Sequence, residues 1–579
     1  MKKIVFVFLF FLFDLIVLYS QTPIPYQNFP IHVDSVRWPY QKAGIPLIAD
    51  LDKDGQKEII TTSLDYNSVL NPVLLLHVTK SDGTNYHNFP KGYNELLFDM
   101  ASGDINGDGY LEIVLRFTFS IDAIDRFGNR LPGFPINYTE SEFILPRFVS
   151  LYDLDNDGKL EIIASRFGEI SVFNYDGTIK AGWPRKIVGR AQYNPAIGDI
   201  DGDGKGELIV TAFKFVNQIV DSASVTIFNN NGELFSTNWP IYFPKPYLSW
   251  SSSPSLYTNK NHPDSNFFLI NIDSSSAPSN TLAWHRFLKF NVHGNIISSK
   301  YYYANHDFGT LVMGDINCDG KIEFATGTQF HIGQLSALDN TLNRLPGWTQ
   351  NGGGEHYATV AIGKLTSAND LNVLSNTWDA IPDGYGHIYS YNINGSQLSW
   401  SPLRPYGIVR AVSIDDLNSD GSAEIIATTL SNQGFFLYAW TIPGVPFTHE
   451  DFPWPQYGHD RYRTNQHGFI PPDEPVGIQP MNTNVPAAFN LYQNFPNPFN
   501  PATSIKFDIT KRGNVKLVVF DMLGRELSTL INESLNPGTY QVSFDARLHG
   551  QGSGLSSGIY FCRLQSEDYV YTMKMNLIK

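Results

Sequence analysis

One nonapeptide pattern, Asp-x-Asp/Asn-x-Asp-Gly-x-x-Glu, occurs six times in this chain of 579 residues. The copies lie at residues 50–58, 104–112, 153–161, 199–207, 315–323 and 416–424. Oxygen-bearing side chains at positions 1, 3 and 5 converge when the backbone curls around them, and the acid at position 9 closes the cage. Glycine at position 6 permits the positive φ of a sharp turn. Because hard cations such as Ca²⁺ bind several such oxygens, the pattern predicts six cation-binding loops.

The spacing of the copies indicates a repeat. The first four copies start at intervals of about 50 residues, and the last two intervals are about twice as long. Each long interval contains a degenerate copy, one starting at Thr258 and the other at Lys364. The chain therefore reads as eight units, of which the fifth and seventh lack the acids and are expected to hold no metal.

Each unit has the composition of a small antiparallel sheet. A short apolar segment precedes the loop, and a β-branched run such as Ile162-Ile163 or Ile425-Ile426 follows it at once. An Asx-Gly turn and an aromatic residue followed by proline come next. Four short strands with hairpin turns, repeated radially, make a β-propeller. We predict an all-β fold with seven or eight four-stranded blades, eight being favoured; EF-hand or dockerin loops would instead need helices after each loop.

The formal net charge of −15 argues against nucleic acid as a partner. The six loops contain 21 acidic residues, so the acidity is explained as a supply of metal ligands. The two cysteines, Cys318 and Cys562, are far apart in the sequence and predict no disulfide framework.

The N-terminus has the composition of a secretory signal peptide. Two lysines precede an apolar run from Ile4 to Tyr19, and the small Ser20 follows it. We assign residues 1–20 to the signal. No other apolar stretch reaches about 18 residues, so no transmembrane span is expected in the mature chain.

The periodic pattern predicts a propeller over residues 21–465. A proline-containing stretch at 466–487 is expected to be a linker. Alternating apolar and polar residues return in 488–579, for example at Ser504 to Ile509 and Tyr540 to Phe544. This alternation predicts a C-terminal Ig-like β-sandwich.

The acidic loops followed by Glu-Ile/Leu-Ile/Val, with Gly-Trp-Pro between copies, resemble the FG-GAP and VCBS repeats of integrin-type propellers. The resemblance implies calcium in the loops, up to six structural ions. The implied ligands are Asp50, Asp52, Asp54, Glu58, Asp104, Asn106, Asp108, Glu112, Asp153, Asp155, Asp157, Glu161, Asp199, Asp201, Asp203, Glu207, Asp315, Asn317, Asp319, Glu323, Asp416, Asn418, Asp420 and Glu424. That family more often has Asp at position 9, so direct or water-mediated closure by Glu stays open.

The C-terminal sequence contains the segments QNFPNPFNPAT, VFDMLGREL, GIYF and KMNLIK. With these segments it closely resembles the sorting domain of the type IX secretion system. The resemblance implies recognition of residues 488–579 by that secretion machinery. It also implies that the protein is released, or displayed on the outer surface, by a bacterium that possesses this system.

The sequence contains no catalytic signature such as HExxH, a phosphate loop or GxSxG. We therefore expect a binding or adhesion module for a glycan or a protein, and we favour this role over an enzymatic one. The alternative is a polysaccharide lyase of the rhamnogalacturonan-lyase type, which shares such propellers. A glycine-rich stretch at residues 352–357 is a candidate functional loop. Residues 457–460 with Thr464 resemble the closing strand of such propellers and are interpreted as structural.

Overall fold

The computed structural model describes most of the chain from Thr22 to Ile578. The described ranges are 22–35, 45–65, 73–138, 148–166, 168–191, 193–216, 219–244, 252–259, 262–274, 283–304, 308–328, 334–348, 350–351, 356–366, 370–377, 384–449, 451–467, 469–471, 479–482, 486, 488–500, 502–511, 513–535, 537–546, 555–566 and 569–578. The predicted signal peptide and residues 352–355 of the glycine-rich stretch lie outside these ranges.

The described residues form strands connected by turns, and the one helical element among them is a 3₁₀ turn, η1 (Pro263–Ser265). The all-β class predicted from the β-branched runs is therefore confirmed. The helices that EF-hand loops would require are not found after any of the six loops, each of which leads directly into a strand.

Among the described residues up to 467, successive strands form a series of sheets. The first four are β3 (Leu47–Ala49), β4 (Glu58–Asp65), β5 (Val73–Thr79) and β6 (Lys91–Tyr93); β7 (Leu97–Gly103), β8 (Glu112–Phe117), β9 (Ser120–Ile124) and β10 (Ile136–Asn137); β11 (Val149–Tyr152), β12 (Glu161–Arg166), β13 (Glu169–Phe173) and β14 (Arg185–Lys186); and β15 (Ala196–Gly198), β16 (Glu207–Val216), β17 (Ile219–Phe228) and β18 (Ile241–Pro244).

The next four sheets are β19 (Ser255–Tyr257), β20 (Phe267–Ser274), β21 (Ala283–Asn291) and β22 (Ile296–Ala304); β23 (Val312–Gly314), β24 (Glu323–Gly327), β25 (Gln334–Leu338) and β26 (Gln350–Asn351); β27 (His356–Gly363), β28 (Asn372–Thr377) and β29 (Ile388–Tyr391); and β30 (Ile408–Asp415), β31 (Ser422–Ser431) and β32 (Gly434–Pro446). Within each of these eight sheets the strands pair in chain order and antiparallel.

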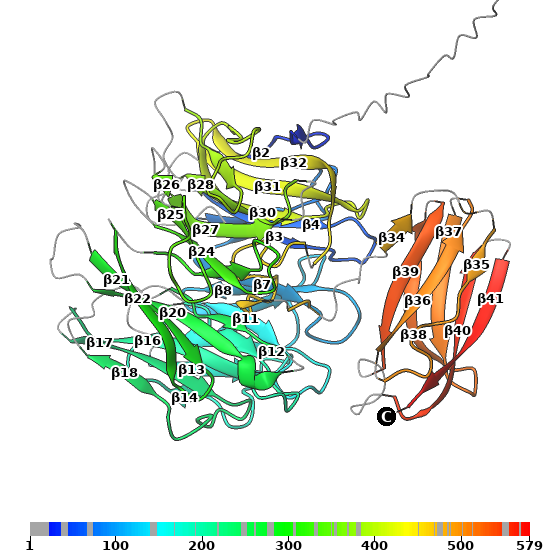
Figure 1. Ribbon diagram of the computed structural model, residues 1–579, viewed down its shortest axis with the longest axis horizontal. Helices are drawn as coiled ribbons and strands as arrows, with labels where there is room; N and C mark the ends of the chain where they lie inside the picture. Colours follow the sequence, from blue (N-terminus) through cyan, green and yellow to red (C-terminus); the bar gives the residue numbers. More distant parts are fainter. Residues whose placement is uncertain are drawn as a thin grey trace, which may run out of the picture.

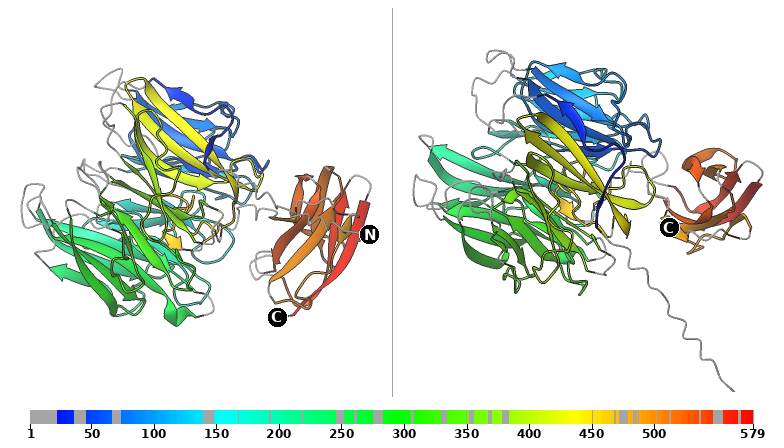
Figure 2. Two further views of the ribbon diagram at one scale, coloured as in Figure 1. Left: turned by 45° about the horizontal axis from the view of Figure 1, so that its top comes forward. Right: turned by 90° about the horizontal axis from the view of Figure 1, so that it is seen from above.

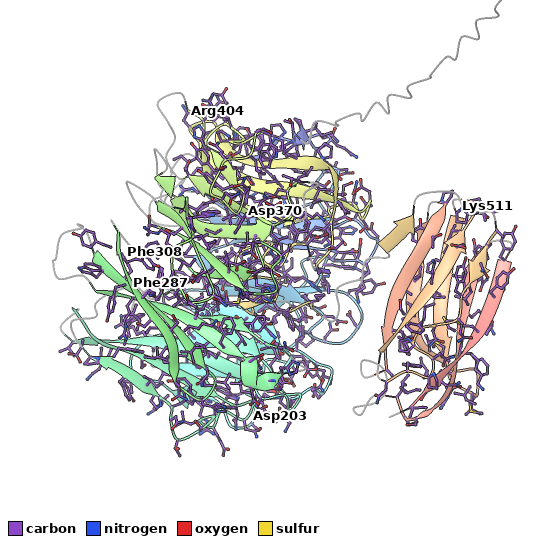
Figure 3. The ribbon with its side chains drawn as sticks, in the orientation of Figure 1. Asp203, Phe287, Phe308, Asp370, Arg404 and Lys511 are labelled. Atoms are coloured by element: carbon purple, nitrogen blue, oxygen red, sulfur yellow. The ribbon has the colours of Figure 1, made fainter. Side chains whose placement is uncertain are left out.

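Each sheet shares a hydrophobic core with the next one along the chain. Phe287 of β21, for example, packs edge-on against Phe308 at a ring separation of 5.0 Å, joining the fifth sheet to the sixth (Figure 3). The last sheet packs in turn against the first, because Ile48 and Ile59 share a core with Ile426 and Leu437. The eight sheets therefore form a closed series.

The N-terminal segment completes the eighth sheet. Strands β1 (Ile24–Pro25) and β2 (Ile31–Asp34) both pair antiparallel with β32, as the blue and yellow ribbons in Figure 1 show. Phe29 between them is buried in the core shared by the eighth and first sheets. Closure thus depends on residues near the beginning of the chain and not on the residues 457–460 predicted for this role.

Residues 451–467, which we call the axial segment, bind the first strands of six sheets through backbone hydrogen bonds. Carbonyl groups of the segment accept from N–H groups of Ile362, Ile414, Ser102, Leu151, Ile197 and Leu256, with distances between 2.8 and 3.0 Å. Its last two residues form β33 (Gln466–His467), which pairs in parallel with β19 (Figure 2). The segment therefore lies where the first strands converge, and it extends into the stretch assigned to the linker.

The C-terminal residues form two further four-stranded sheets (Figure 1, orange to red). One contains β34 (Gln479–Asn482), β39 (Gly538–Asp545), β36 (Ala502–Ile509) and β35 (Asn490–Leu491), and the other contains β38 (Glu526–Leu535), β37 (Gly513–Phe520), β40 (Gly558–Ser566) and β41 (Tyr569–Leu577). They share one core that includes Phe507, Leu517 and Met575. Among the described residues, no helix has the length and apolarity needed to cross a membrane.

Candidate metal loops and a cavity beside the axial segment

The six acidic loops have one backbone arrangement. Each connects the first strand of a sheet to the second. In every loop the Asp at position 1 accepts a hydrogen bond from the N–H of the glycine at position 6, with distances of 2.8 to 3.0 Å. The Asp at position 5 accepts from the N–H at position 7. The glycine at position 6 has a φ near +85° or above in most copies, as in Gly55 and Gly158.

The acid at position 9 closes each loop from the start of the second strand. Its Oε2 accepts a hydrogen bond from the backbone N–H at position 2, as Glu58 does from Leu51 at 3.0 Å. The same bond is present in the other five loops. The two degenerate copies keep it with asparagine, since Asn266 accepts from Asn259 and Asn372 accepts from Leu365. This bond aligns all eight units, including the two that lack the acids.

Neighbouring loops are also hydrogen-bonded to one another. The N–H at position 8 donates to the carbonyl at position 2 of the preceding loop, as Leu111 does to Leu51 and Gly206 to Leu154. Lys57 of the first loop donates to Leu417 of the last at 2.8 Å. The loops therefore follow one edge of the closed series of sheets. The hydrogen bond between the first and last loops closes this series of contacts.

Three of the six loops bring three acids together so that one oxygen from each lies within 4.8 Å of the others. These groups are Asp50, Asp52 and Glu58; Asp153, Asp155 and Glu161; and Asp199, Asp201 and Asp203. Asp203 lies at the outer surface of the molecule (Figure 3). The remaining acids at positions 5 and 9 of these loops, Asp54, Asp157 and Glu207, take part in the backbone hydrogen bonds described above.

The other three loops have asparagine at position 3, and each then has three acids in place of four. In the loop at 104–112, Asn106 Nδ2 donates to Asp108 at 3.2 Å and to Glu112 at 3.1 Å. In the loop at 416–424, Asn418 Nδ2 donates to Asp420 in the same way. In all three loops the asparagine Oδ1 accepts from the N–H at position 5. An oxygen ligand from Asn106 or Asn418 would require the amide to rotate by half a turn.

Burial of the loop carboxyls makes their charged forms unfavourable. Burial raises the pKa of Glu58, Glu112, Glu207 and Glu424 to about 8, and that of Glu161 and Glu323 to about 7. The same cause raises the pKa of Asp50, Asp153 and Asp416 to about 6, although backbone N–H donors oppose it. Carboxyl groups in this state are stabilised in their charged form by a cation.

The loop at 50–58 fits a calcium ion. Asp52 Oδ1 is buried and has no hydrogen-bond partner among the described residues, while its Oδ2 accepts from the Tyr86 hydroxyl at 3.0 Å. An unpaired buried carboxylate oxygen beside Asp50 and Glu58 is what an oxygen-binding cation would satisfy.

In the loop at 153–161, Asp155 Oδ1 is likewise buried without a hydrogen-bond partner among the described residues, but a side chain from outside the loop binds the neighbouring acid oxygens. The ammonium group of Lys180 lies 2.5 Å from Asp155 Oδ2 and 3.0 Å from Glu161 Oε1. The structure thus places a positive side chain among the acids that the sequence predicts as calcium ligands. Nothing in the spacing of the motif indicates this, because Lys180 is outside the loop and belongs to the connection after β13.

A cavity of about 500 Å³ lies beside the axial segment. Gln456, His459, Asp460, Arg461 and His467 of the axial segment line it, together with Asp315 and Cys318 of one acidic loop and Phe447, His449 and Phe452 after β32. The rings of Phe447 and Phe452 are stacked at 4.9 Å. His467 Nε2 and Gln456 Oε1 are buried without a hydrogen-bond partner among the described residues. Imidazole, carboxylate, guanidinium and aromatic groups therefore meet in one hollow.

This cavity was not predicted from the sequence. Most of its polar residues come from the axial segment, in which residues 457–460 with Thr464 resemble a closing strand and were interpreted as structural. A charge pair beside the axial segment was not predicted either. The buried Arg463 and the half-buried Asp99 lie close together, and Asp99 also accepts hydrogen bonds from Asn194 at 2.8 Å and from the N–H of Val149 at 3.2 Å. Their proximity depends on how the sheets pack, so the sequence contains no local signal for it.

Family models match two parts of the chain. Residues 153–210 match the FG-GAP-like repeat, and residues 493–579 match the secretion system C-terminal sorting domain. Both resemblances proposed from the motifs are thereby confirmed. The sorting domain makes this protein a substrate of the type IX secretion machinery, and its location is outside the cell or on the outer cell surface.

No curated protein matches the chain significantly. Among solved structures, the V. cholerae biofilm matrix protein Bap1 is 13% identical, with 75% of this chain and 94% of that chain covered and a TM-score of 0.40. Rhamnogalacturonan lyase YesW is 14% identical over 76% and 98% of the two chains with a TM-score of 0.40, and a Bacillus licheniformis rhamnogalacturonan lyase is 12% identical over 96% and 91% with a TM-score of 0.33.

Proposed function

We propose that this protein is an exported β-propeller of eight blades, fastened by calcium, that binds an extracellular glycan in the cavity beside the axial segment. The eight sheets with shared cores, and the loops joined from Lys57 back to Leu417, support the eight-blade arrangement. The two C-terminal sheets form an Ig-like sandwich that serves export.

In this proposal the acidic loops hold calcium for stability. In the loop at 50–58, Asp50, Asp52, Asp54 and Glu58 would be the ligands, and the loops at 104–112, 199–207, 315–323 and 416–424 would use the same positions. Bound calcium supplies the positive charge that buried carboxylates need. The chain's own backbone N–H groups at positions 2 and 6 orient the acids at positions 9 and 1.

Calcium removal tests this role. The metal content of the purified protein, measured by inductively coupled plasma mass spectrometry, should amount to several calcium ions per chain. Chelation with EDTA should lower Tm, because calcium binds the folded state alone and its removal abolishes that linkage. An unchanged melting curve after verified removal of the metal would contradict the proposal.

The cavity is the observation that carries the binding role. Glycans present many hydroxyl groups and apolar ring faces, so they are bound by polar side chains next to aromatic ones. The cavity provides Asp460, Arg461 and three histidines next to the stacked Phe447 and Phe452. Unpartnered polar atoms such as His467 Nε2 would gain a hydrogen bond from a hydroxyl-bearing ligand.

Binding can be measured on a glycan array, with isothermal titration calorimetry for each hit. His449 lines the cavity without taking part in the axial hydrogen bonds, so His449→Ala should leave the fold intact and weaken binding about tenfold, as loss of one ligand hydrogen bond does. His293, which is exposed in the turn between β21 and β22, provides the matched control, and His293→Ala should bind as the unmodified protein does. Equal loss in both variants, or none in either, would place the binding elsewhere. If no glycan on the array binds and the protein instead captures an extracellular protein, the ligand is a protein and not a glycan.

The same material also tests the enzyme alternative. Incubation with pectic polysaccharides should give no increase in the absorbance of unsaturated uronate products. A steady increase that requires the folded, calcium-loaded protein would replace the binding role by lyase activity.

A further inference from the structure

Lys180 occupies a position that faces the acidic loop of its own sheet. It lies just after the turn at Asp176 and Gly177, and its backbone N–H donates to the carbonyl of Val172 at 2.8 Å. The residue is only 9% exposed, although lysine is among the residues least often buried. Its ammonium group donates to Asp155 Oδ2 at 2.5 Å and to Glu161 Oε1 at 3.0 Å.

The equivalent position in other sheets can be recognised by the same backbone hydrogen bond, from an N–H to the carbonyl eight residues earlier. That bond is made by Tyr86, Leu131, Phe235, Leu345 and Leu398. Tyr86 shows that a side chain here reaches the loop, because its hydroxyl donates to Asp52, the acid at position 3. Among these six residues Lys180 alone carries a charge.

Lys180 binds the acids at positions 3 and 9, which are two of the groups that would surround a calcium ion. Calcium–oxygen distances are about 2.3–2.6 Å, so an ion shared by Asp155 and Glu161 would lie about where the ammonium nitrogen lies. Two cations cannot share that space, and their repulsion at such a separation in a buried site is large. Binding of calcium would therefore require a buried lysine to leave its two partners.

We infer that Lys180 is the resident cation of the loop at 153–161, and that its ammonium group takes the place that calcium has in the five other acidic loops. The inference rests on the proposed calcium role for those five loops. It makes the loop at 153–161 metal-free by substitution, whereas the fifth and seventh units are metal-free because they lack the acids. The chain would then bind five calcium ions and not six.

Calcium counting on variants of Lys180 tests the inference. Lys180→Leu installs the residue found at three equivalent positions and removes the internal cation. We expect five ions in the unmodified protein and six in K180L. Lys159→Leu, in the same loop with its ammonium group over the Tyr175 ring, makes the same charge change without touching the acids and should keep five. Six ions in the unmodified protein, or no gain in folded K180L, would overturn the inference.

Two exposed substitutions provide a second test that does not depend on the folding of K180L. Asp157→Asn alters position 5 of the loop with Lys180, and Asp203→Asn alters the same position of the loop at 199–207. D157N should leave the count unchanged, while D203N should lower it by one. A loss of one ion in D157N would contradict the role of Lys180.

The melting temperature in EDTA separates this inference from the calcium proposal. Without metal, K180L should melt below K159L, because its loop acids have lost their only cation. If the unmodified protein binds no calcium and K180L is still selectively destabilised, the calcium proposal fails and the assignment of Lys180 stands. If the count is five and K180L melts like K159L with no ion gained, Lys180 is not the loop's cation and the calcium proposal stands.

Discussion

The carboxyl groups at position 9 show how burial and charge act at the scale of single residues. Glu58, Glu112 and Glu424 are nearly inaccessible to solvent, yet each keeps one oxygen on a backbone N–H. Burial raises the pKa of each to about 8, so without a metal these groups hold their protons at pH values where they would be charged in the unfolded chain. The sequence identifies these acids by their spacing, but the degree of burial follows from the packing of neighbouring sheets.

We expect the stability of the metal-free protein to fall as pH rises. The folded-state pKa of these acids is raised above the unfolded value near 4.3, so the folded state binds more protons. Their contribution is therefore fully present below about pH 4 and is lost through about pH 7–8. Tm measured in EDTA from about pH 5 to 9 should decrease, and excess calcium should remove the decrease because it displaces those protons. A Tm in EDTA that rises over this range would contradict the expectation.

At the scale of elements, the turns of one sheet touch the connections of the next. The glycine that precedes Trp183 lies against the Asn-Gly turn of the following sheet, and Trp183 Nε1 donates to Asn230 O at 3.1 Å. Gly182 has a φ of +88°, and a Cβ on it would lie 2.1 Å from the carbonyl oxygen of Asn231. The sequence predicts the turns and the aromatic–proline pairs from composition, whereas the contact between adjacent units becomes visible only in the structure.

Gly182→Ala should destabilise the protein by more than its backbone conformation alone would cost. A positive φ costs a residue with a Cβ about 1–2 kcal/mol, and the approach to Asn231 adds a steric cost. Gly444, with a φ of +71° and nothing within 4 Å of a built Cβ, isolates the first part. Urea denaturation should show a larger loss in free energy of unfolding for G182A than for G444A. Equal losses would show that the contact between the units contributes nothing to the free energy of unfolding.

At the scale of the whole molecule, two segments distant in sequence hold the sheets together. The axial segment binds first strands of six sheets, and β1 and β2 complete the sheet of β30–β32. Residues 457–460 were expected in the closing strand, because with Thr464 they resemble the closing strand of integrin-type propellers. The N-terminal residues take that role since Tyr26 and Phe29 bury their rings between the eighth and first sheets.

Phe29→Ala should therefore destabilise the entire set of sheets. Phe29 is 6% exposed, and truncation of a buried phenylalanine costs about 3–5 kcal/mol. Phe119, which is 40% exposed, is the matched control, and Phe119→Ala should cost far less. Thermal unfolding followed by circular dichroism should show a lower Tm for F29A alone. If F29A and F119A have the same Tm, closure through the N-terminal segment does not limit the stability of the molecule.

The sequence by itself determined the all-β class, the six acidic loops and the sorting domain, because each depends on residues close together in the chain. Local spacing sets which oxygens can curl around a cation, and alternation of apolar residues sets which segments form strands. The tertiary structure decided that Lys180 lies among the acids at 153–161, that Asp99 lies beside the buried Arg463, and that strands β1 and β2 complete the last sheet. These outcomes depend on which surfaces meet when the sheets pack, and burial and charge pairing across such contacts are not encoded in any single stretch of sequence.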